Sequence, residues 1–206
     1  MSTAASDQLA PIVVIGGGFA GLTTALAFRH VHPRPPIVLI EPRERFVFVP
    51  LLYELLSGEL KGWEVAPTYA SLLQGRGISH VQDHVQSVDL KARTLQTASA
   101  QTMTYSQLVI ATGAQPTDFG IPGVRDHALR FHTLSDLAPL QQCLQQVRRR
   151  PSGSSTLVIA GAGATGVELA CKLFDMLDGA AAIQLVELGE RILSRSRAFN
   201  REQAQQ

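Results

Sequence analysis

Two glycine-rich runs have the residue types and the spacing to bind the pyrophosphate of a nucleotide. Each fits the pattern G-x-G-x-x-G, the first through Gly16, Gly18 and Gly21 and the second through Gly161, Gly163 and Gly166. In this pattern the first glycine permits a tight turn, the second lets a phosphate approach the backbone, and the third lets a helix pack closely on a strand. After the second glycine of each run a helix begins, and the free N–H groups of its first turn favour an anion. The first residues of these helices are Phe19 and Ala20 in the first run and Ala164 and Thr165 in the second.

A carboxylate follows each run at a similar distance. Glu41 stands 25 residues after Gly16, and Glu187 stands 26 residues after Gly161. An acid in this position accepts hydrogen bonds from ribose hydroxyls. Two such sets in one chain predict two bound dinucleotides, and electron transfer between a flavin and a nicotinamide is the simplest reason to hold both.

Each loop must be positioned by a strand before it, a helix after it and a parallel strand beyond that helix. Short apolar runs precede both loops, Ala- and Leu-rich helical patterns follow them, and Ile37–Glu41 and Ala182–Glu187 read as the second strands. The sequence therefore predicts an α/β fold with two βαβ units, which form an internal repeat. The first unit is not a membrane span, because four glycines interrupt its apolar run and a span needs ~20 apolar residues.

The residues between the two units predict a smaller sheet and a further helix. Apolar and polar side chains alternate over short runs from Ile78 to Tyr105, which predicts an antiparallel β-meander. The run Gln107–Ala114 predicts a buried strand that ends in a glycine turn. Residues 135–150 predict a helix capped by Ser135 or Asp136.

Composition excludes several kinds of function. The formal net charge is +1, which gives no general attraction to nucleic acid. The six histidines show no ligand spacing, so no metal site is predicted. Two cysteines make no disulfide framework, and so small a number favours a reducing compartment. Cys171 is expected on the apolar side of a helix, as a residue of the hydrophobic core, and Cys143 lies in a Leu- and Gln-rich helix.

The sequence resembles a known family, the two-dinucleotide flavoprotein oxidoreductases, and within it the type II NADH:quinone dehydrogenases. The resemblance rests on VVIGGGFAGL, FVFVPLLYELLSGEL, YSQLVIATGA, FGIPGV and GAGATGVELA, and it extends from residue 10 to about residue 195. The stretch PLLYELLSGELKGWEVAP is most similar to the cyanobacterial and plastid branch. The family implies an FAD/NAD(P)-binding Rossmann-like fold. Its disulfide reductases carry a cysteine pair soon after the first βαβ unit, and this sequence has none.

By this resemblance the first unit binds FAD and the second binds NAD(P)H, with NADH favoured. Besides the first loop and Glu41, the residues implied to contact FAD are Pro50, Leu51, Val85, Ala111, Thr112 and Gly113. Glu187 is implied to favour NADH because its carboxylate repels a 2′-phosphate, while Arg191, Arg195 and Arg197 leave NADPH open.

Glu168 is the candidate catalytic residue, because it falls where the family places a glutamate near nicotinamide and flavin. From the residues alone it is a carboxylate that favours a helix N-terminus.

The resemblance implies that a hydride passes from NAD(P)H to FAD and that electrons pass on to a quinone. It also implies a truncated chain, with the first part of an FAD-binding domain in residues 1–117 and a linker and incomplete NAD(H)-binding domain in residues 118–206. Two other interpretations stay open: a catalytically silent nucleotide-binding fragment or half of a split enzyme, and a sulfide:quinone or ferredoxin-type reductase.

The implied partners are a quinone and either a complementary chain or a second copy. The implied location is cytoplasmic, with peripheral membrane contact on the cytoplasmic face made through the absent C-terminal part.

Overall fold

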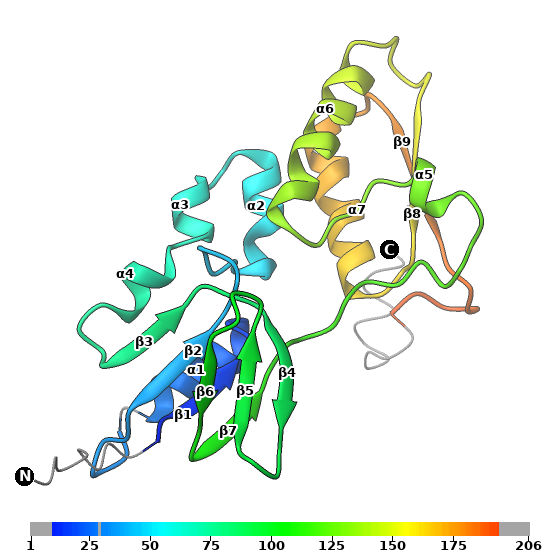
Figure 1. Cartoon of the computed structure of the whole chain (residues 1–206). Helices are drawn as coiled ribbons and strands as arrows, with labels where there is room; N and C mark the ends of the chain where they lie inside the picture. The colour runs from blue at the N-terminus through cyan, green and yellow to red at the C-terminus, as the bar shows by residue number, and fades with distance from the viewer. Residues whose placement is uncertain (1–9, 29, 194–206) are drawn as a thin grey trace, which may run out of the picture. The chain divides into compact units, whose positions relative to one another are not determined.

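The computed structural model describes residues 10–28 and 30–193, which form two compact units. The first unit holds residues up to Phe48 and residues Ala66–Phe119, and the second holds Val49–Val65 and the residues from Gly120 onward. The short segment Val49–Val65 therefore packs with a part of the chain that lies more than fifty residues further along the sequence (Figure 1).

A parallel sheet organises the first unit. Its strand order is β3-β2-β1-β7, and all neighbouring strands are parallel. The strands are β1 (Ile12–Ile15), β2 (Ile37–Ile40), β3 (Ile78–Val81) and β7 (Gln107–Ile110). Because Ile15, Ile40, Val81 and Ile110 are in register, the carboxyl ends of all four strands meet at one edge, which is where open parallel sheets bind ligands.

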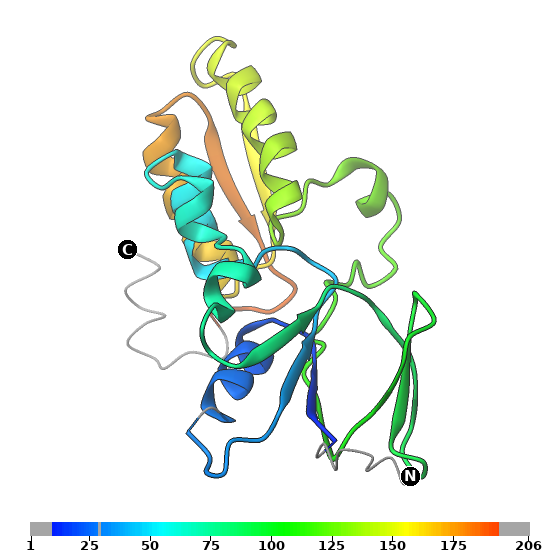
Figure 2. The same ribbon diagram turned by 60° about the vertical axis from the view of Figure 1, so that its left-hand side comes forward.

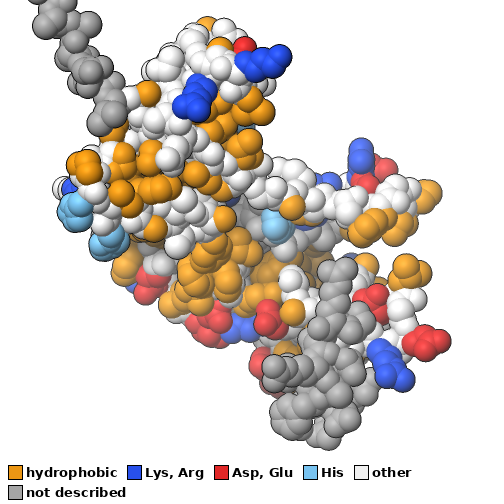
Figure 3. All heavy atoms as spheres, turned by 90° about the horizontal axis from the view of Figure 1, so that it is seen from below, with side chains coloured by type: hydrophobic (Ala, Val, Ile, Leu, Met, Phe, Trp, Pro, Cys, Tyr) orange, Lys and Arg blue, Asp and Glu red, His pale blue; other side chains and the backbone are white. Residues whose placement is uncertain are grey.

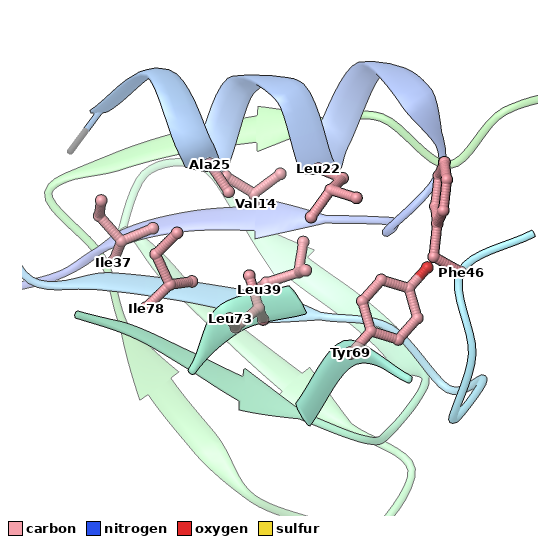
Figure 4. Packing of buried hydrophobic residues seen from close by; sticks show 9 residues of the cluster. All are labelled: Val14, Leu22, Ala25, Ile37, Leu39, Phe46, Tyr69, Leu73 and Ile78. Carbon is pink, nitrogen blue, oxygen red and sulfur yellow. The ribbon is translucent and has the colours of Figure 1, made fainter. Parts of the chain in front are cut away.

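The two faces of this sheet have separate hydrophobic cores. On one face, α1 (Phe19–Phe28) and α4 (Tyr69–Leu73) cover Val14, Leu39 and Ile78, as Figure 4 shows. On the other face, Val13, Ile15 and Ile40 pack with Leu95 and Tyr105. β1 is buried along its whole length because successive side chains enter opposite cores.

An antiparallel three-stranded sheet covers the second face (Figure 2). Its strands are β4 (Val85–Asp89), β5 (Thr94–Thr97) and β6 (Thr102–Thr104), in that order. The predicted meander is thus confirmed for Val85–Thr104. Its predicted start was wrong, because Ile78–Val81 pairs in parallel with β2 and is the edge strand of the main sheet.

The second unit contains the second βαβ repeat. Strands β8 (Thr156–Ala160) and β9 (Ala182–Val186) are parallel neighbours joined by α7 (Ala164–Leu177). The other elements of this unit are η1 (Val49–Leu51), α2 (Leu52–Ser57), α3 (Gly62–Val65), α5 (Val124–His127), η2 (Leu134–Asp136) and α6 (Leu137–Arg148). Side chains of β8 and β9 alternate between half-buried and exposed, so one face of the pair is open, with Val158 and Val186 at least half exposed.

Two local expectations were wrong. The strand β7 is a half-exposed edge, and its Ile110 is 65% exposed. Cys171 is exposed, whereas Leu173 and Leu177 form the buried side of α7.

The cap expected for α6 is confirmed for Asp136, which is the N-cap residue of that helix, although its side chain makes no capping hydrogen bond there. The Asp136 carboxylate instead accepts the backbone N–H groups of His132 and Thr133, in a capping box with Thr133 across the 3₁₀ turn η2.

Hydrophobic side chains reach the surface at several places (Figure 3). The large ones exposed by more than two thirds are Trp63, Leu90, Phe119, Phe174 and Leu188. Within the described residues no helix combines the length and the hydropathy needed to cross a membrane.

Candidate dinucleotide sites

The first glycine loop connects β1 to α1 at the carboxyl edge of the parallel sheet. Gly16 has a φ of +97°, and a Cβ there would overlap the carbonyl oxygen of Ala111. A Cβ at Gly21 would overlap the carbonyl oxygen of Gly16, so both positions require glycine. At Gly18, by contrast, a Cβ would meet nothing within 4 Å. No atom of the protein would clash with a side chain at Gly18, and the open space beside it fits a phosphate that approaches the backbone.

Glu41 lies directly after β2 and is buried beside this loop. Its Oε2 accepts the backbone N–H of Gly17 at 2.7 Å. Arg43 donates to the same carboxylate from its backbone N–H (3.0 Å), from Nε (2.7 Å) and from Nη2 (3.0 Å). Burial opposes ionisation of Glu41, but the hydrogen bonds from Arg43 and Gly17 outweigh it and leave the pKa of this carboxyl below its usual range.

Tyr69 supports the loop from the side of the core. Its ring is fully buried, and its hydroxyl donates to the carbonyl oxygen of Gly17 at 2.7 Å. Burial and the nearby charge of Glu41 raise the pKa of Tyr69 to about 12, so the phenol stays a neutral donor. A Cβ at Gly17 would lie 2.5 Å from this hydroxyl and 2.8 Å from Cγ of Glu41. Gly17 is therefore required by packing, although it is not part of the G-x-G-x-x-G pattern.

The remaining FAD residues predicted in the first unit lie partly at the same edge. Ala111 follows β7, donates its N–H to Ile15 at 2.8 Å and contacts the first loop, with Thr112 and Gly113 exposed just beyond it. Phe19 opens α1 and packs edge-on against Phe46 and Phe48, while Ala20 beside it is exposed. Val85 is half-buried at the start of β4, and its contact with an adenine stays a prediction.

The second loop repeats the first in the other unit. Gly161 has a φ of +103°, and a Cβ at Gly166 would overlap its carbonyl oxygen. Gly163 again has nothing within 4 Å of an added Cβ, and its carbonyl accepts the first helical bond, from Val167 at 3.0 Å. Ala164 and Thr165 are exposed in the first turn of α7, as the predicted anion site requires.

Glu187 stands after β9 as Glu41 stands after β2. Its Oε2 accepts the N–H of Ala162 at 2.7 Å, the equivalent of the Gly17 bond. Its Oε1 accepts the N–H groups of Leu188 (2.9 Å) and Gly189 (3.3 Å). These backbone donors, led by Ala162, lower the pKa of Glu187, which is therefore ionised at neutral pH.

The two loops differ at one supporting contact. The carbonyl of Ala162 accepts the backbone N–H of Leu193 at 2.8 Å, where the carbonyl of Gly17 accepts the Tyr69 hydroxyl. An alanine is accommodated in the second loop and not in the first, because in the first the bulky phenol fills the space beside the peptide.

The other residues that the sequence predicted to contact a cofactor either belong to the second unit or lie outside the described residues. Pro50 and Leu51 form η1, which packs in the second unit, so their approach to a flavin stays a prediction. Glu168 is exposed in the second turn of α7. Arg191 is exposed, whereas Arg195 and Arg197 lie outside the described residues.

Two supporting residues, Arg43 and Tyr69, were missed by sequence reasoning. Arg43 could have been noticed, because a cation two residues after a ribose-binding acid has an obvious partner. Tyr69 carried no such signal, since it is 52 residues from Gly17 in the sequence.

The residues present fit two dinucleotides. Each loop combines space at its middle glycine, free N–H groups at a helix start and an ionised carboxylate at the neighbouring strand end. No group of three or more His, Cys, Asp or Glu side chains is arranged to hold a metal ion in the part of the chain that the structure describes.

Comparison with known proteins identifies the family. The model of the pyridine nucleotide-disulphide oxidoreductases matches residues 10–206. The chain is 38% identical to the demethylphylloquinone reductase NdbB of Synechocystis sp., covering 97% of this chain and 52% of that protein. It is 33% identical to the alternative NAD(P)H-ubiquinone oxidoreductase C1 of Arabidopsis thaliana, covering 94% and 41%.

Solved structures agree on the fold. NDH2 of Plasmodium falciparum in complex with NADH superimposes with a TM-score of 0.80 at 20% identity, over 94% of this chain and 44% of that one. The sulfide:quinone oxidoreductase of Aquifex aeolicus gives 0.77 at 28% identity, over 86% and 43%. The chain spans about half the length of the curated relatives it matches. The duplicated loops and these matches together show that the chain belongs to the pyridine nucleotide-disulphide oxidoreductase family.

Proposed function

We propose that this chain contributes both nucleotide sites of an FAD-dependent oxidoreductase that takes a hydride from NAD(P)H and passes electrons to a quinone. The observation that carries the proposal is the repetition of one set of contacts in two units. In each, a loop N–H donates to a strand-end carboxylate at 2.7 Å beside a glycine with open space. A single nucleotide would need only one such set.

The residues of the first unit would bind FAD, whose bound isoalloxazine supplies the two-electron chemistry. The free N–H groups at the start of α1 would face the pyrophosphate. Glu41 would accept ribose hydroxyls, but four donors already fill the roughly four acceptor positions of a carboxylate. The Arg43 side chain, which is 56% exposed, would therefore release at least one of its two bonds when the ribose binds.

The residues of the second unit would bind NADH in preference to NADPH. Glu187 accepts three backbone N–H groups and keeps acceptor capacity for a ribose hydroxyl. Its negative charge would repel a 2′-phosphate. The overall reaction balances when NADH, one proton and a quinone give NAD⁺ and a quinol.

The quinone is proposed from the relatives and not from residues of this chain. The relatives in Synechocystis and Arabidopsis are named as quinone reductases, and the family match covers all the described residues. A quinone pocket and a peripheral membrane contact are assigned to no residue here.

The purified chain tests the proposal directly. After incubation with FAD and removal of free cofactor, we expect flavin absorbance to stay with the protein. Anaerobic NADH should bleach that absorbance, NADPH should do so less well, and a short-chain quinone should restore it. Protein that keeps no flavin, or keeps flavin that NADH does not bleach, would contradict the proposal and leave a silent nucleotide-binding chain.

A sulfide:quinone reductase is the second candidate, because the sulfide-quinone reductase of Aquifex aeolicus is 33% identical over 68% of this chain. Sulfide and NADH offered separately to the flavin-loaded protein distinguish the two. Bleaching by sulfide alone would replace the first proposal with the second.

A further inference from the structure

The Arg43 side chain occupies the carboxylate that the first site would offer to a ribose. Its Nε donates to Oε1 of Glu41 at 2.7 Å, and its Nη2 donates to Oε2 at 3.0 Å. Each carboxylate oxygen therefore receives one bond from the guanidinium, in the two-pronged arrangement that arginine forms with a carboxylate. Each oxygen also receives one backbone N–H, that of Arg43 on Oε1 at 3.0 Å and that of Gly17 on Oε2 at 2.7 Å.

The two side-chain bonds can be exchanged, whereas the two backbone bonds are fixed by the fold. The Arg43 side chain is 56% exposed, so its guanidinium can turn into water, while the Glu41 side chain is buried. A ribose has two neighbouring hydroxyls, and each donates one hydrogen. The hydroxyl pair therefore matches the guanidinium bond for bond, one to each carboxylate oxygen.

The second site has no such side chain at the equivalent position. Glu187 corresponds to Glu41, and the residue two positions further along is Gly189 in place of Arg43. The backbone bonds are repeated, because Ala162 donates to Oε2 at 2.7 Å and Gly189 donates to Oε1 at 3.3 Å. Since glycine has no side chain, no guanidinium reaches the carboxylate from this position.

We propose that Arg43 is a specificity-determining residue of the first site, where its guanidinium takes the place of a missing ribose hydroxyl. The inference rests on the part of the proposed function in which Glu41 accepts the ribose hydroxyls. A complete ribose releases both guanidinium bonds. A deoxyribose releases one, and the other fills the acceptor position that the missing hydroxyl leaves. At the second site that position stays empty, so selection for ribose is stricter there.

Release of the guanidinium is tested by NMR of the cofactor-free chain. ADP is the probe, because FAD and NADH both contain it. Arg43→Met assigns the Nε–H signal of Arg43, and the amide signals of Gly18 and Gly163 report on the two sites separately. ADP should move the Arg43 signal together with that of Gly18, whereas pyrophosphate, which has no ribose, should move Gly18 alone. An Arg43 signal that stays in place while Gly18 responds to ADP would overturn the inference and leave the proposed function standing.

The selectivity is measured as the ratio of the dissociation constants of 2′-deoxy-ADP and ADP. The two probes carry the same phosphates, so any attraction of Arg43 for phosphate cancels in the ratio. At the first site of the wild type the ratio should be within about twofold. In Arg43→Met it should rise to about tenfold, because a buried acceptor is then left without a donor. A ratio that Arg43→Met does not change would overturn the inference.

The second site offers the reciprocal substitution. Gly189 is exposed, and a Cβ there would meet only Oε1 of Glu187, at 4.0 Å, so an arginine can be accommodated. The ratio at the second site should be about tenfold in the wild type and about twofold in Gly189→Arg. A second-site ratio that Gly189→Arg leaves unchanged would overturn the inference even if Arg43→Met disturbed the first unit.

Arg45→Met is the matched control. The Arg45 side chain is 45% exposed and donates to the carbonyl oxygen of Ala66 at 3.0 Å, so the substitution removes the same charge from the same unit. It should leave the ratio at the first site unchanged. A rise equal to that of Arg43→Met would mean that charge alone sets the selectivity, and it would overturn the inference.

The outcomes also separate the inference from the proposed function. Ratios that change as expected in a chain whose flavin NADH never bleaches would uphold the role of Arg43 and contradict the proposed redox function. A chain in which neither Gly18 nor Gly163 responds to ADP would overturn both.

Discussion

Replacing Gly17 by alanine is the most direct test of how the first loop is built. The new Cβ would lie 2.5 Å from the Tyr69 hydroxyl, 2.7 Å from its Cζ and 2.8 Å from Cγ of Glu41. These atoms cannot move away cheaply, because Tyr69 is fully buried and hydrogen-bonded and Glu41 is 3% exposed. Overpacking costs about 1–3 kcal/mol, and disturbing the Tyr69–Gly17 bond costs about 1 kcal/mol more. Gly17→Ala should therefore destabilise the first unit by about 2–4 kcal/mol.

Urea denaturation of the cofactor-free chain measures this loss. With a denaturant slope of about 2 kcal/mol per molar, the middle of the range usual for small proteins in urea, the midpoint should fall by roughly 1–2 M. Far-UV circular dichroism is the suitable signal, because the single tryptophan, Trp63, belongs to the second unit.

Gly18→Ala is the matched control, since its Cβ would meet nothing within 4 Å. It should leave the midpoint unchanged and weaken FAD binding instead. In a Tyr69→Phe background, Gly17→Ala should cost less than in the wild type, because the nearest atom is gone. A Gly17→Ala midpoint equal to that of Gly18→Ala would refute the packing described for Tyr69 and Glu41.

Three further outcomes are expected. The pKa of Glu41 is lowered in the folded chain, so the stabilisation from its ionised carboxylate is complete above the unfolded pKa of about 4.5 and is lost as pH falls through the folded value. Arg43→Met removes part of what lowers that pKa. In denaturation midpoints measured across pH 3–6, the variant should therefore lose this stabilisation at a higher pH than the wild type. Glu187→Gln should raise the affinity for NADPH relative to NADH about fivefold in equilibrium titrations, as expected when one exposed charge repulsion is removed. In alkylation followed by mass spectrometry, exposed Cys171 should react faster than half-buried Cys143, and equal rates would contradict the orientation of α7.

The two βαβ units could be predicted because their signals are local. Gly16 and Gly161 adopt positive φ, and Gly21 and Gly166 sit against a carbonyl only five residues away, so short spacing alone marks both loops. The acids follow because strand and helix lengths fix their distance.

The placement of Ile78–Val81 could not be predicted in the same way. A strand at a sheet edge and a strand of a meander show the same alternation of side chains. Its partner is β2, about 40 residues earlier, and no local pattern records that pairing.

The expectation that Cys171 is buried on α7 was wrong for a geometric reason. Its sequence is apolar on most sides, with Phe174 exposed at 69%. Cys171 precedes buried Leu173 by two residues, about 200° around a helix, and therefore points the opposite way. Tyr69 could not be foreseen either, because the peptide that it supports, that of Gly17, is 52 residues away in the sequence.

The excursion of residues 49–65 into the second unit has a practical consequence for dissecting this protein. The polypeptide passes from one unit to the other three times, after Phe48, after Val65 and after Phe119. A gene cut once after codon 119 would strand α2 without α7, exposing Leu52 and Leu56 and leaving Lys172 without its carboxylate. Each half expressed alone would therefore be destabilised. A protease that cleaves the folded chain after residue 119 would instead leave the two fragments associated, because Val49–Val65 packs with the second unit.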